Sequence, residues 1–178
     1  DRYYRQGDIS LTGLLPDGKR AVIYVDGNVT IQSPVGGKVG FATSTYEWGS
    51  IDQVPSLYII ASGNINVNND VPRLDGSFIS QGGVIKSCTV DGDDPTTSEL
   101  TEQCRTQLVV NGAFIADTVR LLRTFGSLRD GVELEDPSST SAAETFMFNP
   151  TQWMTSGGGL PSNSKMQIDS YTSLPPSL

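Results

Sequence analysis

The residues best suited to chemistry in this chain are its carboxylates, because the 178-residue sequence contains no histidine. That absence excludes Ser/His/Asp and Cys/His nucleophile arrangements and every histidine-containing zinc site. Two carboxylates about 5 to 10 Å apart could hydrolyse a glycosidic bond. The candidates for such work are Asp70, Asp75, Asp91, Asp93 and Asp94.

A structural role is the favoured interpretation of the aspartates that precede glycine. Asp26 and Asp75 each stand before a glycine, a place where Asp is common because its side chain bonds to the turn backbone. Asn111 holds the equivalent place in a similar segment, as a turn residue would and a catalytic residue would not. We therefore expect no catalytic residues and no enzymatic activity.

The acidic segment after residue 90 partly fits a calcium loop. Asp91, Asp93 and Glu102 stand at its first, third and twelfth places, but Pro95 replaces a ligand and Thr96 replaces the expected glycine. A solvated acidic loop without a cofactor is the favoured interpretation. Calcium bound by Asp91, Asp93 and Glu102 stays as the alternative.

The two cysteines, Cys88 and Cys104, flank this acidic segment. We interpret them as one disulfide that closes the loop, in preference to two free thiols, with a stabilisation of about 3 kcal/mol. A disulfide is typical of an oxidising compartment, so the sequence predicts an extracellular or cell-surface location.

Composition limits the partners of the chain. Twenty acidic against 12 basic residues give a net charge of −8, which disfavours nucleic acid and anionic membranes. No apolar run approaches the roughly 18 to 20 residues of a membrane span. Any membrane attachment is expected through a segment outside this chain.

The elements that must position these residues are short strands with glycine-marked bends. Segments 22–31, 59–67, 73–80 and 108–116 each join two apolar stretches through a small polar residue and a glycine. Gly27 and Gly76 are 49 positions apart, as are Gly63 and Gly112, which indicates two copies of a two-strand unit. The predicted fold is mainly β, a short right-handed parallel β-solenoid-like repeat domain with a terminal cap; an antiparallel β-sandwich is the alternative.

We assign residues 1–154 to the repeat-built domain with its cap, and residues 155–178 to a linker and extended C-terminal tail. A short helix is expected near the cap, since Ser141 and Glu144 fit a capping box and Pro150 would limit the helix. The aromatic residues could form sugar-stacking platforms, although core or cap packing is the favoured role; they are Tyr46, Trp48, Phe146 and Trp153.

Four stretches carry a resemblance to a known group: QLVVNGAFIA (107–116), VRLLRTFGSLRD (119–130), AAETFMFNP (142–150) and YTSLPP (171–176). Together they resemble the C-terminal extracellular region of uncharacterised surface or pilus-associated proteins of candidate-phylum bacteria. The resemblance covers about residues 57 to 178. It implies an extracellular role and no active site, and such proteins typically carry an N-terminal membrane or pilin-like segment, which we expect to lie outside these 178 residues.

The sequence therefore predicts an extracellular, non-enzymatic structural or adhesive protein, such as a subunit of a cell-surface fibre or a pilus-associated component. Its expected partners are further copies of itself, other surface proteins or glycans. A carbohydrate-active enzyme or glycan-binding module is the alternative.

Overall fold

The computed structural model describes residues 1–33, 38–42, 47–125 and 142–149, and this part of the chain is mainly β. One sheet, called sheet A here, contains β1 (Arg2–Gln6), β4 (Arg20–Asp26), β7 (Ser56–Ala61), β9 (Arg73–Ser80), β11 (Leu108–Ile115) and β13 (Glu144–Met147). Sheet B contains β2 (Ile9–Leu11), β5 (Val29–Ile31), β8 (Ile65–Asn68), β10 (Val84–Thr89) and β12 (Thr118–Arg120). The smaller elements are β3 (Leu14–Leu15) paired with β6 (Gly40–Phe41), the 3-10 helix η1 (Ile51–Gln53) and the helix α1 (Thr97–Glu102).

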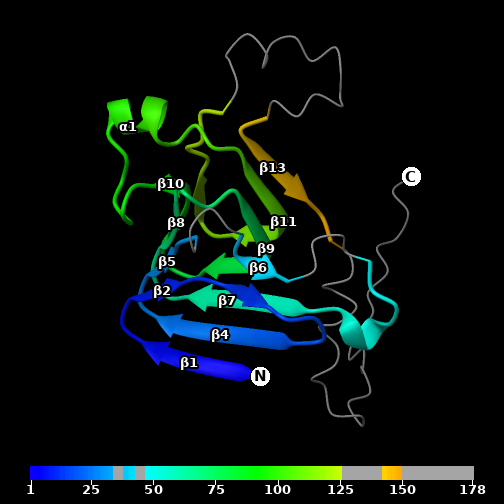
Figure 1. The fold of residues 1–178 in the computed structure, drawn as a ribbon. Coiled ribbons are helices and arrows are strands. Elements are labelled where there is room, and N and C mark those ends of the chain that lie inside the picture. Colours follow the sequence, from blue (N-terminus) through cyan, green and yellow to red (C-terminus); the bar gives the residue numbers. More distant parts are fainter. Residues whose placement is uncertain (34–37, 43–46, 126–141, 150–178) are drawn as a thin grey trace, which may run out of the picture.

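All pairings between these named strands are parallel. The chain passes from a strand of sheet A to a strand of sheet B and then returns to sheet A beside the strand it left, as β1, β4 and β7 show in Figure 1. We call one strand of sheet A with the sheet B strand that follows it a coil. A mainly β fold with parallel sheets is confirmed.

The alternative of an antiparallel β-sandwich is wrong. Hairpins would place consecutive strands side by side in opposite directions, but here consecutive long strands lie in different sheets. The Asp-Gly at Asp26 and the Ser-Gly at Ser62 bend the chain from sheet A into sheet B and do not reverse it.

The bends from sheet A to sheet B are short, and the first four of the five carry glycines. They occupy residues 7–8, 27–28, 62–64, 81–83 and 116–117. A Cβ on Gly27 would lie 2.6 Å from the carbonyl carbon of Gly7, and a Cβ on Gly83 would lie 2.6 Å from that of Gly63. Because neighbouring backbones approach so closely, the bends at Gly27 and Gly83 accept only glycine at the contact.

A side-chain ladder beside the glycines fixes the register of the coils. The backbone N–H of Asn28 donates to Asp8 Oδ1 at 2.7 Å, that of Asn64 to Asn28 Oδ1 at 2.8 Å, and that of Val84 to Asn64 Oδ1 at 2.8 Å. The first of these bonds, with a second from the Asn28 side chain, lowers the pKa of Asp8. Equivalent residues therefore lie 20 positions apart (8 to 28, 64 to 84) or 36 positions apart (28 to 64).

The predicted 49-residue repeat is consequently wrong. Gly76 and Gly112 are partners of each other inside β9 and β11, whereas the N–H of Gly63 donates to the carbonyl of Gly27 at 3.0 Å. The 49-residue spacing compares bend glycines with glycines in the middle of strands. Local sequence around the two kinds of glycine is similar, but their places in the coils differ.

The core lies between the sheets and is filled mainly by inward side chains of the strands from β4 to β11. Phe78 and Phe114 are in register on β9 and β11, and their rings meet edge to face at 5.8 Å. The fully buried side chains of the core include Val29, Ile31, Phe41, Ile59, Ile65, Val67, Leu74, Phe78, Ile85 and Leu108.

The short helix expected near residue 141 is wrong, because Glu144–Met147 forms β13, parallel to β11. Tertiary contacts decide the conformation here. Glu144 Oε1 accepts from Ser87 Oγ at 2.7 Å and from the N–H of Arg123 at 2.8 Å, and Phe146 packs edge to face on Phe114. The rest of the proposed cap after residue 149, and the proposed tail 155–178, lie outside the described residues.

Candidate binding surface

The structure places Asp26, Asp70 and Asp75, which the sequence analysis considered for chemical or turn roles, in different surroundings. Asp75 is fully buried in β9, where its carboxylate accepts bonds from the N–H of Phe41 at 3.0 Å and from Asn111 Nδ2 at 3.2 Å. It also pairs with Arg73 Nε at 3.4 Å. Asp75 thus joins its own strand, β9, to β6 through Phe41 and to β11 through Asn111.

The turn interpretation of Asp75 is wrong, since the residue lies within a strand. Its predicted equivalence to Asn111 is correct, because the two are partners in the ladder between β9 and β11. Asp26 does stand at a bend, at the exposed end of β4, where it accepts a bond from Ser62 Oγ at 3.1 Å. Asp70 is exposed and accepts from the N–H of Ser33 at 3.4 Å.

Cys88 and Cys104 form the predicted disulfide. The loop that it closes contains α1, whose first turn is a capping box: Thr96 Oγ1 accepts from the N–H of Glu99, and the Glu99 carboxylate accepts from the N–H of Thr96. That bond lowers the pKa of Glu99. The sequence pattern Thr-x-x-Glu at Thr96 and Glu99 is a capping-box signal for this helix that sequence reasoning missed.

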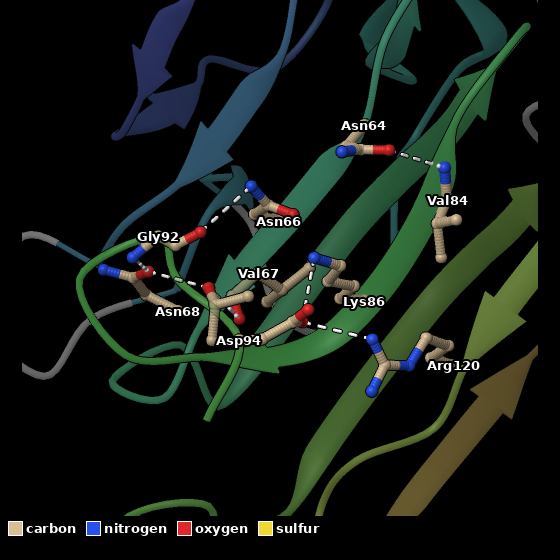
Figure 2. Close-up of polar contacts among 10 residues, drawn as sticks. Asn64, Asn66, Val67, Asn68, Val84, Lys86, Gly92, Asp94 and Arg120 are labelled. Carbon is tan, nitrogen blue, oxygen red and sulfur yellow. Dashed lines mark hydrogen bonds and ion pairs between the residues drawn. The ribbon is translucent and has the colours of Figure 1, made fainter. Parts of the chain in front are cut away.

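The calcium candidates are not brought together as a site. Within the described residues there is no group of three or more Asp, Glu, Cys or His side chains placed to hold a metal ion, so Asp91, Asp93 and Glu102 form none. Their neighbour Asp94 is engaged instead by two cations: Lys86 Nζ lies 2.8 Å and Arg120 NH1 3.2 Å from Asp94 Oδ1 (Figure 2). The bond from Lys86 is the main cause that lowers the pKa of Asp94.

The same loop is held to sheet B by two asparagines. Asn66 Nδ2 donates to the carbonyl of Gly92 at 3.1 Å, and the N–H of Gly92 donates to Asn68 Oδ1 at 3.0 Å (Figure 2). Asn66 and Lys86 are register partners on β8 and β10, and Lys86 pairs with Arg120 on β12. The polar outer face of sheet B is therefore occupied by the chain's own loop.

Arg123 is a buried cation with a structural task. Its side chain is 6% exposed, and it donates to the carbonyls of Asn68, Asn69, Val71, Ser87 and Thr106 at 2.8 to 3.4 Å. Burial lowers the pKa of Arg123 to about 10, so the guanidinium stays charged at neutral pH. It joins the end of β8 and the residues after it to β10 and to the segment after α1.

The outer face of sheet A carries a row of exposed or half-buried apolar side chains, one on each of five neighbouring strands. Register pairs connect them in sequence from β1 to β11. Tyr4, Tyr24 and Ile115 are 64%, 40% and 51% exposed, and the other two are half-buried. We call this set the outer row; it consists of Tyr4, Tyr24, Ile60, Ile79 and Ile115.

Local sequence explains why these side chains point outward. In β4, buried Ala21 and Val25 alternate with Val22, Tyr24 and Asp26, because successive side chains of a strand lie on opposite faces. The alternation was visible in the sequence. Sequence reasoning missed the row because only register brings one member from each strand onto a common line.

A shallow hollow of about 210 Å³ lies beside the row. Aromatic and polar groups share its lining, which consists of Tyr4, Tyr24, Val25, Asp26, Ile60, Ser62 and Gln81. Its polar part includes the bond from Ser62 Oγ to Asp26. Apolar rings and hydrogen-bonding groups therefore meet in one exposed place.

A second hollow, of about 400 Å³, opens at the coil that contains β1 and β2. It is mainly apolar and includes Tyr3, Leu11, Leu15, Ile23 and Leu57. These side chains belong to the end of the core where β1 pairs only with β4, and β2 only with β5, among the described strands. The hollow thus lies at the end of the core that no further coil covers among the described strands.

The aromatic residues considered from sequence as sugar platforms have the favoured packing roles where they are described. Trp48 meets Phe41 edge to face at 6.4 Å, and Phe146 meets Phe114 at 5.2 Å. Tyr46 and Trp153 lie outside the described residues.

Comparisons with family models, with curated proteins and with solved structures found no match to this chain. In the part of the chain that the structure describes, the helices are too short or too polar for a membrane crossing.

Proposed function

We propose that this chain is an extracellular, non-enzymatic protein with a structural or adhesive role, built as a short right-handed β-solenoid. The regular alternation between sheets A and B supports the solenoid, because stacked coils of this kind bury a core that one coil could not bury alone. Parallel strands joined by a crossover are right-handed in about 98% of known cases, which supports the handedness.

The outer row is the observation that carries the binding role. Its five members lie on adjacent strands in register, so with strands about 4.8 Å apart the row extends for about 19 Å. Contiguous exposed apolar side chains on a soluble surface typically mark an interaction site. A protein that adheres or assembles needs such a surface, and the row provides one on a rigid sheet.

The contacts of the carboxylates support a non-enzymatic role. Asp75 bonds to the backbone of Phe41, Asp94 neutralises Lys86, and Glu144 accepts two bonds from its neighbours. Each of these carboxylates is used to join strands or loops. The chain also has no histidine that could serve as a general base.

The disulfide between Cys88 and Cys104 is compatible with the proposed extracellular location. The proposed partners are further copies of the chain or other surface proteins. Among the described strands, β1 and β2 each leave one edge unpaired, and an unpaired edge can accept a strand from another molecule. Because the net charge of −8 opposes association, self-association should strengthen as salt screens that charge.

The test compares wild-type protein with a row variant that carries Ile60→Thr, Ile79→Thr and Ile115→Thr. Threonine keeps the β-branched shape of the strand residues and removes much of the apolar surface. Val119→Thr is the matched control, because Val119 is 38% exposed on β12 of sheet B. Beads coated with each protein are assayed for attachment to one another and to protein-coated and polysaccharide-coated surfaces.

We expect wild-type and control beads to attach and the row variant to lose most of that attachment. Circular dichroism checks that all three proteins remain folded. Wild-type beads that attach to nothing, from a protein that stays monomeric at high and low salt, would contradict the proposed role. Turnover of a polysaccharide that is lost on substitution of one carboxylate would contradict the non-enzymatic part.

A further inference from the structure

The hollow beside the outer row offers two features that suit one class of ligand, namely exposed aromatic rings and hydrogen-bonding groups. Tyr4 and Tyr24 are register partners on β1 and β4, and both rings are well exposed. An aromatic face carries negative partial charge, so it attracts the slightly positive C–H groups on the face of a sugar ring. Two such rings side by side offer a stacking surface.

The polar groups around the rings are available to a ligand. Within the described residues, the hydroxyls of Tyr4 and Tyr24 and the side-chain amide of Gln81 make no hydrogen bond to protein. Asp26, which accepts from Ser62 Oγ at 3.1 Å, completes the polar rim of the hollow. A ligand that covers the rings must therefore also present hydrogen-bonding groups to this rim.

This requirement disfavours two other occupants of the hollow. The apolar face of a second copy would bury the Tyr24 hydroxyl, the Gln81 amide and the Asp26 carboxylate without new partners, which is unfavourable. An anionic ligand would meet the Asp26 carboxylate on a protein of net charge −8. A neutral ligand with both C–H faces and hydroxyl groups satisfies both parts of the hollow.

We propose that the hollow formed by Tyr4, Tyr24 and Ile60 with Asp26, Ser62 and Gln81 binds a neutral glycan. The volume of about 210 Å³ is below the roughly 300–1,000 Å³ of deep ligand pockets, so the site contacts a short stretch of the glycan. The inference rests on the adhesive function proposed above, for which it names the ligand class.

The test measures binding of neutral hexasaccharides of the cello-, manno- and xylo- series by isothermal titration calorimetry, with polygalacturonate as the anionic probe. Tyr4→Ala and Tyr24→Ala are each expected to weaken binding about tenfold, as loss of one stacking contact does. Tyr24→Phe keeps the ring and should retain most of the affinity. Tyr3→Ala is the matched control, since Tyr3 is 45% exposed on the same strand and lines the other hollow.

Binding of a neutral hexasaccharide that falls in Tyr24→Ala and is unchanged in Tyr3→Ala supports the proposal. Absence of binding to all three series or equal binding of polygalacturonate would overturn it. An affinity that is unchanged in both Tyr4→Ala and Tyr24→Ala would also overturn it. In that event the bead assay separates the two claims. Attachment that still depends on the outer row leaves the adhesive function standing without a glycan ligand, and attachment that does not depend on the row contradicts both.

Discussion

Replacement of Arg123 by methionine should destabilise the protein strongly, although no ligand or surface contact is removed. Methionine retains most of the side chain's volume but none of its donors. The change leaves the carbonyls of Asn68, Asn69, Val71, Ser87 and Thr106 without the bonds that the guanidinium supplies. These groups join the ends of β8 and β10 to the segment after α1.

The magnitude follows from burial. Each buried polar group left without a partner costs about 1–3 kcal/mol, but some of these carbonyls can move toward water when the side chain is shortened. Removal of one side of a buried charged network typically costs about 3–5 kcal/mol. Since Arg123 is only 6% exposed, we expect a loss of about 4 kcal/mol in the free energy of unfolding.

Urea unfolding followed by circular dichroism measures this loss. Arg120→Met is the matched control, because Arg120 is 45% exposed in its ion pair with Asp94 and should cost less than about 1 kcal/mol. Arg123→Lys keeps the charge but cannot reach several carbonyls with one ammonium group, so it should recover only part of the loss. A cost for Arg123→Met no greater than that for Arg120→Met would refute the assigned role.

Three further substitutions or treatments test other parts of the structure. Reduction of Cys88–Cys104 should lower the free energy of unfolding by about 3 kcal/mol without changing the circular dichroism spectrum, and two alkylatable thiols in the unreduced protein would contradict the disulfide. Asp94→Asn should lower the free energy of unfolding by up to about 1 kcal/mol near pH 7. Because the pKa of Asp94 in the folded protein is lower than the unfolded value of 3.8, this stability advantage of the wild type is present above pH 3.8. It is lost as the pH falls through the folded pKa. An advantage that persists in urea unfolding at about pH 2 would contradict the ion pair with Lys86. Gly112→Ala should cost about 2 kcal/mol or more in the same assay, because Gly112 has φ +148° and an added Cβ would collide with the carbonyl of Gly76; a cost below about 0.5 kcal/mol would contradict that close approach.

The fold class could be predicted because its signals are local. Short apolar runs, bend glycines and the two cysteines all predict features that the structure has. The register could not be predicted, because it depends on which coil lies beside which. Asn28 bonds to Asp8 and Asn64 to Asn28, so the spacing is 20 residues in one coil and 36 in the next, and a search for one constant period finds neither.

The same limit explains the two capping boxes. Thr96 and Glu99 begin a real helix, whereas Ser141 and Glu144 fit the same pattern but Glu144 is the first residue of strand β13. In the first segment the helix is exposed and local bonds decide its conformation. In the second, Glu144 bonds to Ser87 and Arg123 and the strand pairs with β11, so distant residues outweigh the local preference.

The carbohydrate-binding proposal could not be reached from sequence for a related reason. Tyr4 and Tyr24 are 20 positions apart in the chain and become neighbours only through the pairing of β1 with β4. Sequence reasoning considered Tyr46, Trp48, Phe146 and Trp153 as sugar platforms and favoured packing roles for them. Where these are described, packing contacts occupy their rings.

The unequal lengths of the connections indicate that the chain can accept inserted residues on one side of the molecule more easily than on the other. Every bend from sheet A to sheet B spans two or three residues, whereas the returns to sheet A range from residues 69–72 to residues 32–55. An insertion at a bend would displace the glycine stack and shift both sheets at once. An insertion in a return lengthens a surface loop at little entropic cost, so new segments, natural or grafted, should accumulate along one side of the molecule while the other side keeps its spacing.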